Sequence, residues 1–468
     1  MNTKLSERGY SVLLSELPCH ILKNIKSDLC VQPIENPNYK TGIKPWNIYQ
    51  LSKTKIYLPR YYGIKMFGPP VLNTLNIPVL SNLNGLTISH PTISHPTISQ
   101  DHDTLLFNGS MRPLQESVVD LTLKTLTDPG GLGSGVICLA TGLGKTVVAL
   151  NIVSKTKEKT LIIVHAEFLL EQWKTRIGQY LPNAKIGVIQ QERCETDCDI
   201  VIGMLQTIIS RDIVFESFGM MIIDECHHIA AKSFSGLFFK IQTKYILGLS
   251  ATPDRKDGLT KVIDYFLGPQ IVNIKTNVHN PSIQFLFTDT THFVEKFNNL
   301  GKVNSPTMIT DLTKNEQRNE QIILKIKELL KSNRKILVLT DRRDHCFKLK
   351  EYLDRSSSLD KSSSNQPITT GVYLGGMKQT ERETTISASV IIGTYQAAGE
   401  GFDVPDLDTL IMATPKSDTE QAVGRILRQK NNNDPLVIDI VDSVSIFKMQ
   451  YYKRNKFYKS KEWQILKK

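Results

Sequence analysis

The 468-residue sequence predicts an α/β protein, in which two tandem doubly wound parallel-sheet domains follow a small N-terminal accessory region. Two observations carry this prediction. From about residue 112 onward, short apolar segments alternate with amphipathic helical segments, and the series occurs twice along the chain. The apolar segments are nearly continuous in Val, Ile and Leu, which is typical of parallel strands that are covered on both faces.

The first series contains five expected strands, separated by helices such as 146–157 and 167–177. These strands are 135–140, 160–166, 198–204, 220–226 and 245–251. The second series contains five more strands and three helices. Its strands are 335–341, 368–375, 389–395, 408–415 and 436–442, and its helices are 315–332, 344–353 and 419–429. A serine-rich stretch, 354–367, interrupts the second series and is interpreted as an exposed flexible insertion.

Changes in composition divide the chain into four parts. Residues 1–108 form the accessory region, which is rich in Pro and Asn. Its last part, 86–101, contains a tandem T-I-S-H-P repeat and is expected to be an extended linker, because proline at every fifth position forbids a helix. We expect the first sheet domain over 109–290, the second over 291–446 and a basic, aromatic helix over 447–468.

The charge of the chain points to a polyanionic partner. The net charge is +11 at pH 7 and the isoelectric point is near 9.1, which favours nucleic acid as that partner. Seven cysteines without a repeated spacing argue against a disulfide framework and for a reducing compartment. No apolar run approaches the roughly 20 residues that span a bilayer. We expect a soluble, intracellular protein with no membrane partner, and the sequence does not distinguish nucleus, cytoplasm and virion.

The segment ATGLGKT, 140–146, follows one expected strand and opens a helix, as a phosphate-binding loop does. Glycines 142 and 144 let backbone N–H groups face an anion at the positive end of that helix. Lys145 is then expected to reach the β- and γ-phosphates, and Thr146 to bind Mg²⁺. We therefore predict an ATP site, with Mg²⁺ as second cofactor, formed by Ala140, Thr141, Gly142, Leu143, Gly144, Lys145 and Thr146.

The segment IIDECHHIAA, 222–231, places two carboxylates, a thiol and two imidazoles side by side. A zinc site would need a tetrahedral set of ligands, whereas His227 and His228, adjacent in sequence, tend to point apart. Nucleotide hydrolysis fits the pattern better. We predict that Asp224 binds Mg²⁺ through water and that Glu225 polarises the water that attacks the γ-phosphate. Their strand is expected to lie beside the phosphate loop, and His227 is expected to hydrogen-bond across the domain cleft.

With these two motifs in place, the sequence resembles the superfamily 2 DExH helicases over about residues 110 to 445. Seven elements stand in the order of that family. They are RPLQ at 112–115, the phosphate loop, LIIVHAEFLLEQW at 161–173, the acidic motif, SAT at 250–252, IIGTYQAAGEGFDVPDLDTLI at 391–411 and QAVGRILR at 421–428. The resemblance implies two RecA-like lobes that hold ATP between them and that move along nucleic acid as they close and open.

The resemblance also implies roles for individual residues. Contacts to the nucleotide are implied for Arg112, Gln115, Gly401 and Asp403. Catalytic roles from the second lobe are implied for Gln421, Arg425 and Arg428, and both arginines are expected to reach the γ-phosphate. Contacts to nucleic acid are implied for Gln172, Thr207, Arg255 and Thr394.

Within this superfamily, GLSATPDRKDGL and EFLLEQW are similar to the branch that contains the eukaryotic repair helicase XPB and a poxvirus transcript-release helicase. The short N-terminal region suits a compact viral or bacterial type. Arg255, Lys256 and Asp257 stand where that branch carries an Arg-Glu-Asp element linked to strand separation, and Lys256 departs from the pattern.

The C-terminal segment 447–468 carries eight Lys or Arg against one Glu, with aromatics interleaved. Two interpretations are open and compatible. The segment could stack bases and bind phosphates as a single-strand platform. Its aromatic spacing, with Phe447, Tyr451 and Tyr458, also fits a helix that packs on the second domain and leaves its lysines in water, and we favour this packed helix.

We expect an ATP-dependent helicase or translocase that moves 3′ to 5′ on single-stranded or forked DNA. The resemblance suggests transcription termination or transcript release, with RNA polymerase or transcription factors as partners. Two alternatives stay open. The chain could be an RNA helicase, because residues that bind phosphate and sugar do not show whether the 2′-hydroxyl of RNA is recognised. It could also be an ATPase that remodels a transcription complex without unwinding free duplex.

Overall fold

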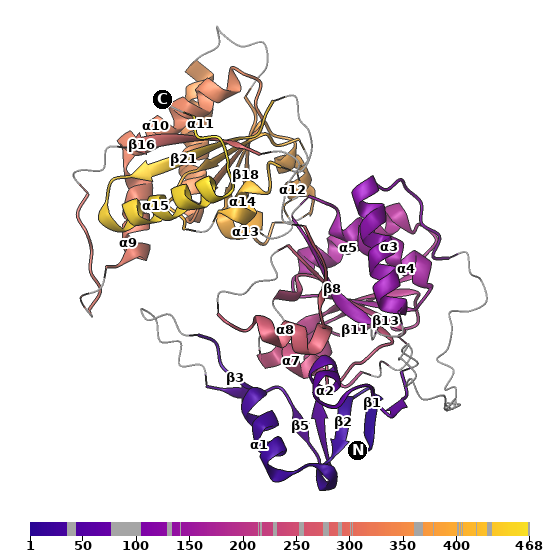
Figure 1. Cartoon of the computed structure of the whole chain (residues 1–468). Coiled ribbons are helices and arrows are strands. Elements are labelled where there is room, and N and C mark those ends of the chain that lie inside the picture. Colours follow the sequence, from indigo (N-terminus) through magenta and orange to yellow (C-terminus); the bar gives the residue numbers. More distant parts are fainter. Residues whose placement is uncertain are drawn as a thin grey trace. The chain divides into compact units, whose positions relative to one another are not determined.

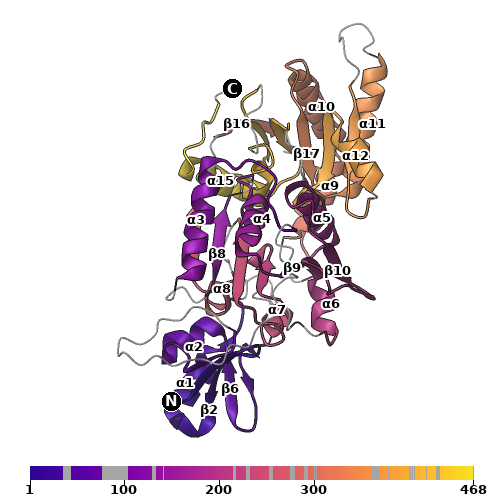
Figure 2. The same ribbon diagram turned by 90° about the vertical axis from the view of Figure 1, so that its right-hand side faces the viewer.

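The computed structural model divides the chain into two units, Met1–Lys275 and Thr276–Lys468, and each is described by itself (Figures 1 and 2). The residues that the structure describes are 1–34, 44–75, 104–128, 133–140, 142–213, 215, 218–227, 232–251, 257–274, 280–288, 293–299, 301, 303–359, 368–377, 379–399, 402, 404, 406–417, 419–427 and 433–466. The expected linker at 86–101 lies outside them. Within the described residues, no helix is long and apolar enough to cross a membrane.

The accessory region forms a small mixed sheet whose strand order is β5-β6-β2-β1-β7. The strands are β1 (Thr3–Ser6), β2 (Gly9–Leu13), β5 (Gln50–Leu51), β6 (Lys55–Leu58) and β7 (Leu72–Asn73). A separate pair consists of β3 (Cys30–Val31) and β4 (Trp46–Asn47), and the helices are α1 (Cys19–Asp28) and α2 (Arg60–Phe67). Apolar residues alternate with polar ones along β1 and β6, so that one face of this sheet is buried and the other is more exposed.

Helix α2 fastens the accessory region to the rest of the first unit. Arg60 is fully buried, and its Nη2 donates to Oε1 of Gln242 at 2.9 Å and to the carbonyl oxygen of Thr243 at 2.7 Å. The Tyr61 hydroxyl donates to the carbonyl oxygen of Ser134 at 2.9 Å. Apolar side chains of both parts form one continuous core. The accessory region is therefore an integral part of this unit.

The main sheet of the first unit has the order β11-β10-β12-β9-β13-β14-β8-β15, and every pair except β10·β11 is parallel. The strands are β8 (Ser134–Leu139), β9 (Thr160–Val164), β10 (Ile186–Gln190), β11 (Arg193–Cys194), β12 (Ile200–Met204), β13 (Met220–Ile223), β14 (Tyr245–Ser250) and β15 (Gln270–Ile274). All five expected strands are present, two or three residues shorter in three cases. The three additional strands, β10, β11 and β15, were not predicted.

Helices cover both faces of this sheet, as the doubly wound prediction requires (Figure 1). Apolar residues of α3 (Pro113–Thr127), α4 (Lys145–Thr156) and α5 (Glu167–Tyr180) form one core with one face. Apolar residues of α6 (Leu205–Ser210), α7 (Lys232–Leu237) and α8 (Thr260–Leu267) form the other core, which continues into the accessory region. The carboxyl ends of the parallel strands therefore meet at one edge, where ligands of open α/β sheets bind.

The second unit is a six-stranded parallel sheet of order β16-β21-β20-β17-β19-β18. Its strands are β16 (Ser282–Thr288), β17 (Ile336–Thr340), β18 (Thr370–Tyr373), β19 (Val390–Thr394), β20 (Thr409–Met412) and β21 (Leu436–Asp442). Its helices are α9 (Ser305–Lys314), α10 (Glu316–Leu330), α11 (Arg343–Leu359), α12 (Gln379–Ile386), α13 (Tyr395–Gly399), α14 (Glu420–Val423) and α15 (Ser445–Ser460). The expected boundary at 290 would place β16 in the first domain, whereas β16 pairs with β21 in the second sheet.

Two expectations for the second unit are wrong. The helix expected over 419–429 ends at Val423, because turns closed by bonds from Arg425 N to Ala422 O and from Ile426 N to Val423 O replace it. The serine-rich stretch begins inside α11, which continues to Leu359, and the rest of that stretch, 360–367, lies outside the described residues. Ion pairs one helical turn apart, Lys350–Asp354 and Glu351–Arg355, stabilise the end of α11.

Candidate ATP site and nucleic-acid contacts

The phosphate loop connects the buried strand β8 to helix α4. Gly142 and Gly144 have φ angles of 88° and 86°, which side chains with a Cβ rarely adopt. A Cβ at Gly144 would also collide with the amide of Gln115. No side chain caps α4, and the amides of its first turn are the groups that bind phosphate in such loops. The local geometry therefore matches the loop that the sequence predicts.

Gln115 holds this loop from the side of helix α3. Its Nε2 donates to the carbonyl oxygen of Leu143 at 3.0 Å, and its Oε1 accepts from the backbone N–H of Arg112 at 2.9 Å. Gln115 is buried, so both bonds are shielded from water. The structure thus brings Arg112 and Gln115 to the loop. The contacts to the nucleotide implied for this pair stay a prediction.

The acidic motif begins where strand β13 ends. Strand β14 lies between β13 and β8 in the sheet. Side chains span that one strand. Lys145 Nζ lies 3.4 Å from Oε1 of Glu225, so the two motifs meet at the carboxyl edge of the sheet. Glu225 itself has a φ of 48°, a left-handed conformation that is uncommon for a residue with a side chain.

Asp224 is buried and held by two donors. The indole Nε1 of Trp173, on helix α5, donates to Oδ2 at 2.9 Å, and the backbone N–H of Glu225 donates to Oδ1 at 3.0 Å. Burial raises the pKa of Asp224 to about 6, and the charge of Glu225 adds to the rise, while Lys145 and the bond from Trp173 lower it. Sequence reasoning missed Trp173, because no local pattern reveals a contact between residues 51 positions apart.

His227 contacts residues at or just after the carboxyl ends of strands β13 and β14. Its Nδ1 is 3.2 Å from Oγ of Ser250, at the end of β14, and 3.4 Å from Oε2 of Glu225. Ser250 is the first residue of the SAT segment, so this contact links the acidic motif to that segment. The bond across the domain cleft that we expected for His227 stays a prediction.

The acidic residues and the phosphate loop offer oxygen ligands for a metal ion. Within the described residues, no group of three or more His, Cys, Asp or Glu side chains could hold a metal ion. The Asp224 carboxylate and the hydroxyl of Thr146, the second residue of α4, are the hard oxygen donors that Mg²⁺ prefers. The residues therefore fit Mg²⁺, which stays a prediction.

Three of the residues predicted to contact nucleic acid are described, two in helices and one at the end of a strand. Gln172 lies in α5, next to Trp173, and Thr207 lies in the first turn of α6, where its Oγ1 accepts from the backbone N–H of Gln191 at 3.1 Å. In the second unit, Thr394 ends β19, and its Oγ1 accepts from the N–H of Ala397 at 3.2 Å. These positions are compatible with the predicted contacts and do not test them.

Arg425 is buried in the second unit, where its Nη1 donates to the carbonyl oxygen of Phe402 at 2.8 Å. Phe402 belongs to the segment 391–411, so the two motifs of this unit are in contact. The remaining predicted residues lie outside the described part of the chain: Thr141, Arg255, Gly401, Asp403, Arg428 and the side chain of Gln421.

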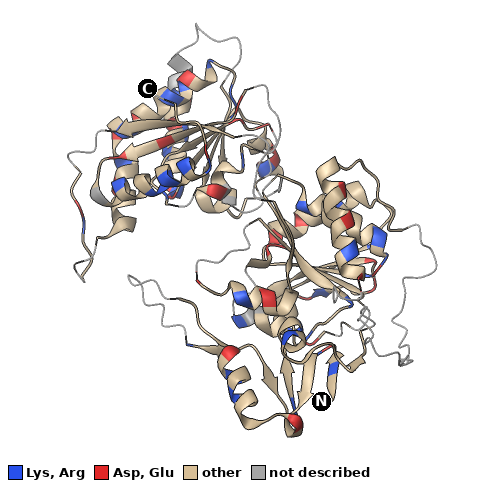
Figure 3. Cartoon of the chain, viewed as in Figure 1, with Lys and Arg blue, Asp and Glu red and all other residues tan. Residues whose placement is uncertain are grey.

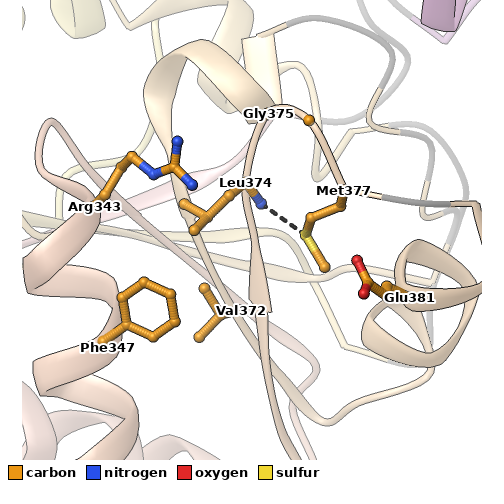
Figure 4. A pocket seen from close by; sticks show the side chains of 8 residues that line it. Arg343, Phe347, Val372, Leu374, Gly375, Met377 and Glu381 are labelled. Atoms are coloured by element: carbon orange, nitrogen blue, oxygen red, sulfur yellow. Dashed lines mark hydrogen bonds between the residues drawn. The ribbon is translucent and has the colours of Figure 1, made fainter.

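A pocket of about 310 Å³ lies in the second unit, between α11 and the segment after β18 (Figure 4). Arg343 and Phe347 of α11 face Val372 and Leu374 across it, and the Sδ of Met377 accepts from the N–H of Leu374 at 3.1 Å. None of the predicted site residues lines this pocket.

Two family models match the chain in the order of the two units. Residues 108–255 match the model described as type III restriction enzyme, res subunit, and residues 320–430 match the helicase conserved C-terminal domain. Together with the two parallel sheets and the phosphate loop, these matches define the class of protein. The chain belongs to the superfamily 2 helicases and is an ATP-dependent helicase, that is, an ATP hydrolase that acts on nucleic acid.

Viral proteins are among its relatives. The chain is 33% identical to "Putative ATP-dependent RNA helicase L396" of Acanthamoeba polyphaga mimivirus, across the whole of this chain and 87% of the relative. It is 30% identical to "Putative ATP-dependent RNA helicase QP509L" of an African swine fever virus isolate, over 75% of this chain and 73% of the relative. It is 29% identical to "Putative helicase 161L" of Invertebrate iridescent virus 6, over 70% and 76%.

Proposed function

We propose that this chain is a DNA-stimulated ATPase that translocates 3′ to 5′ along one strand of single-stranded or forked DNA, in transcription termination or transcript release. The observation that carries its motor chemistry is the meeting of the two motifs, in which Lys145 pairs with Glu225 and Asp224 is held by a side chain of helix α5. The choice of DNA, polarity and process follows from the likeness of 167–173 and 248–259 to the XPB branch.

The pairing of Lys145 with Glu225 suggests how ATP would prepare the site. Incoming phosphates would compete for the Lys145 ammonium, because phosphate oxygens carry more charge than one carboxylate. Glu225 would then be free to polarise the attacking water. When bound, Mg²⁺ would neutralise charge on the phosphates, with Thr146 and Asp224 as its protein ligands. A nearby cation favours the ionised form of a carboxylate, so bound Mg²⁺ would lower the pKa of Asp224, which burial raises.

The second unit would contribute Arg425 and Arg428 to the γ-phosphate, with Gln421 beside them. An arginine that stabilises the charge of the transition state is worth on the order of 10³ to 10⁵ in rate. The bond from Arg425 to Phe402 O supports this role, because it fixes the guanidinium relative to the segment that contains Gly401 and Asp403. Hydrolysis would then depend on closure of the two lobes, which couples ATP to movement.

A panel of nucleic acids tests the substrate class. ATP turnover is measured with single-stranded DNA, duplex DNA, RNA and a DNA–RNA hybrid, and strand displacement is measured on forks with a 3′ or a 5′ tail. We expect single-stranded DNA to stimulate turnover most and the fork with a 3′ tail to be unwound. If RNA but not DNA stimulated ATP turnover, the substrate would be RNA and the proposal of a DNA substrate would be wrong.

An RNA helicase is the second candidate, and the curated names of the mimivirus and African swine fever virus relatives favour it. The third candidate, a remodelling ATPase with RNA polymerase or transcription factors as partners, predicts stimulated turnover without displacement on any fork. A remodelling ATPase would release the transcript from a stalled polymerase complex, whereas an inactive preparation would not.

A further inference from the structure

Helix α15 has one face that the second sheet does not cover. Tyr458 and Arg454 are buried against that sheet, and Phe447 is buried against helix α9. Lys448, Tyr452, Lys456 and Lys459 are exposed and follow one another at spacings of four, four and three residues, so they share the opposite face. Met449 is exposed beside them. The packed helix that we favoured is therefore confirmed over Ser445–Ser460 but does not continue to 468 as expected, and a basic, aromatic stripe runs along its outside.

The stripe keeps its positive charge, because α15 contains no Asp or Glu. Figure 3 shows basic residues along α15 and no acidic ones. Within the described residues, Lys448, Lys456 and Lys459 have no hydrogen bond or ion pair to a side chain. Three free ammonium groups on about 16 Å of helix would favour a polyanion.

The carboxylates of the elements packed against α15 are already paired, and Glu462, an exposed residue just after the end of α15, is the one acidic residue close in sequence to the stripe. In β21, Asp439 accepts two bonds from Arg454, and Asp442 accepts two from Arg318. At the ends of α15, Asp311 of α9 pairs with Lys296, and Glu420 of α14 pairs with Lys461. The lysines of the stripe are left for a ligand outside the chain.

Exposed rings extend the stripe onto the edge strand β16. Phe287 is 50% exposed, and its ring centroid lies 5.9 Å from that of Tyr451, which lies 5.3 Å from that of Tyr452. Tyr452 is 56% exposed. Bases stack on such rings with little regard to sequence, whereas the carboxylates of an acidic peptide do not stack on them. The combination therefore favours nucleic acid over an acidic protein.

We propose that the outer face of α15, together with Phe287, is an accessory binding site for single-stranded nucleic acid. Phosphates contact Lys448, Lys456 and Lys459, and a base stacks on Tyr452. The site goes beyond the motor function, since α15 holds no residue of the predicted ATP site. It retains the strand while the lobes open, which would raise processivity.

Binding without nucleotide tests the proposal. The full chain is titrated into fluorescein-labelled dT20, and fluorescence anisotropy is followed between 50 and 200 mM salt, conditions chosen because phosphate contacts weaken strongly over about this range. The variant Lys448→Ala/Lys456→Ala/Lys459→Ala is expected to bind about tenfold or more weakly at low salt. It should also flatten the plot of log affinity against log salt by about 2, at roughly 0.7 per lost phosphate contact.

A matched variant controls for loss of charge alone. Lys23, Lys53 and Lys65 are exposed lysines of the accessory region, and Lys23→Ala/Lys53→Ala/Lys65→Ala removes the same charge. This variant should bind like the wild type. Equal weakening in both triple variants, or wild-type binding in the α15 variant, overturns the proposal. ATP turnover without nucleic acid should be unchanged in both, so failure of this site is distinct from failure of the motor.

Stacking is tested at Tyr452. We expect Tyr452→Ala to weaken binding about fivefold or more and Tyr452→Phe to restore it, because each base stacked on a ring contributes measurably. Photocrosslinking of wild-type protein to bromodeoxyuridine-substituted dT20, mapped by mass spectrometry, should label 448–459. The proposal would be rejected, and the face assigned to an acidic protein, by two results together. Polyglutamate of equal charge would displace dT20, and Tyr452→Ala would bind dT20 as tightly as the wild type.

Discussion

At the scale of single residues, the bond from Trp173 to Asp224 connects a predicted nucleic-acid helix to a predicted catalytic carboxylate. Trp173 follows Gln172 in α5, and its indole is almost completely buried. A bound nucleic-acid strand that moved α5 would also move the Trp173 indole, which donates to Asp224. We therefore expect Trp173 to act as a positioning residue that would connect bound nucleic acid to the ATP site.

Trp173→Phe removes the N–H donor while it keeps most of the buried ring. A hydrogen bond to a charged group contributes about 1.5 to 3 kcal/mol, so we expect kcat for ATP to fall about tenfold or more with KM little changed. Steady-state turnover and thermal melting measure this. Trp46→Phe is the control, because Trp46 is also buried but its Nε1 has no hydrogen bond in the described structure. Unchanged kcat in Trp173→Phe would remove the positioning role.

His345 makes the stability of the second unit depend on pH. Its ring is buried between the Thr340 hydroxyl at 2.8 Å and Oδ1 of Asn319 at 3.0 Å, and burial lowers its pKa to about 3. The unfolded chain takes up a proton below its ordinary pKa of about 6.5, whereas the folded chain does not. The stability due to the neutral ring is therefore complete above about pH 6.5 and is lost as pH falls toward 3, by about 1.4 kcal/mol per pH unit.

Chemical denaturation at several pH values measures this effect as the difference between wild type and His345→Gln. The difference should shrink as pH falls from 6.5 to 4, while His20→Gln, a change at an exposed histidine, should track the wild type. A difference that stays constant over that range would mean that His345 does not stay neutral in the fold.

At the scale of elements, a buried ion pair attaches α15 to the sheet. Arg454 donates through Nε and Nη2 to both oxygens of Asp439, at 2.8 and 2.7 Å, and the Tyr458 hydroxyl donates to Oδ2 of the same carboxylate. Burial raises the pKa of Asp439, while Arg454 opposes the rise. This pair explains why a helix with many lysines docks on an apolar sheet.

Arg454→Met leaves the Asp439 charge buried and unpaired, so we expect the free energy of unfolding to fall by about 3 to 5 kcal/mol. Arg454→Met/Asp439→Leu should cost less than the single change, since neither charge then remains buried. Lys350→Met, which breaks an exposed pair with Asp354, should change stability by no more than about 0.5 kcal/mol. If Arg454→Met were as mild as Lys350→Met, the pair would not be what fastens α15.

The elements also show how far the sequence predicts the fold. All ten expected strands are present, because buried parallel strands are continuous apolar runs. The strands that were missed lie at or near sheet edges, where β15 (QIVNI) mixes polar and apolar residues, and β11 has two residues. The strand order that puts β14 between β8 and β13 could not be read from local patterns, nor could the bonds of Gln115 and Trp173, which are contacts of the tertiary structure.

At the scale of the whole molecule, the division between Lys275 and Thr276 separates the phosphate loop from the arginines of the second unit. The fragment Met1–Lys275 contains both the accessory region and the first sheet, which share one core. We expect this fragment to fold and to bind an ATP analogue but not to hydrolyse ATP in response to nucleic acid, because it lacks Arg425 and Arg428. Stimulated turnover by the fragment alone would show that catalysis needs no residue of the second unit.

The most direct test of the motor assignment compares ATP turnover by the full chain and by Lys145→Ala, each with and without single-stranded nucleic acid. If Lys145 binds the phosphates, the wild type should be stimulated and Lys145→Ala should show no stimulated turnover while melting at a similar temperature. A folded Lys145→Ala protein that retains nucleic-acid-stimulated hydrolysis would contradict the account.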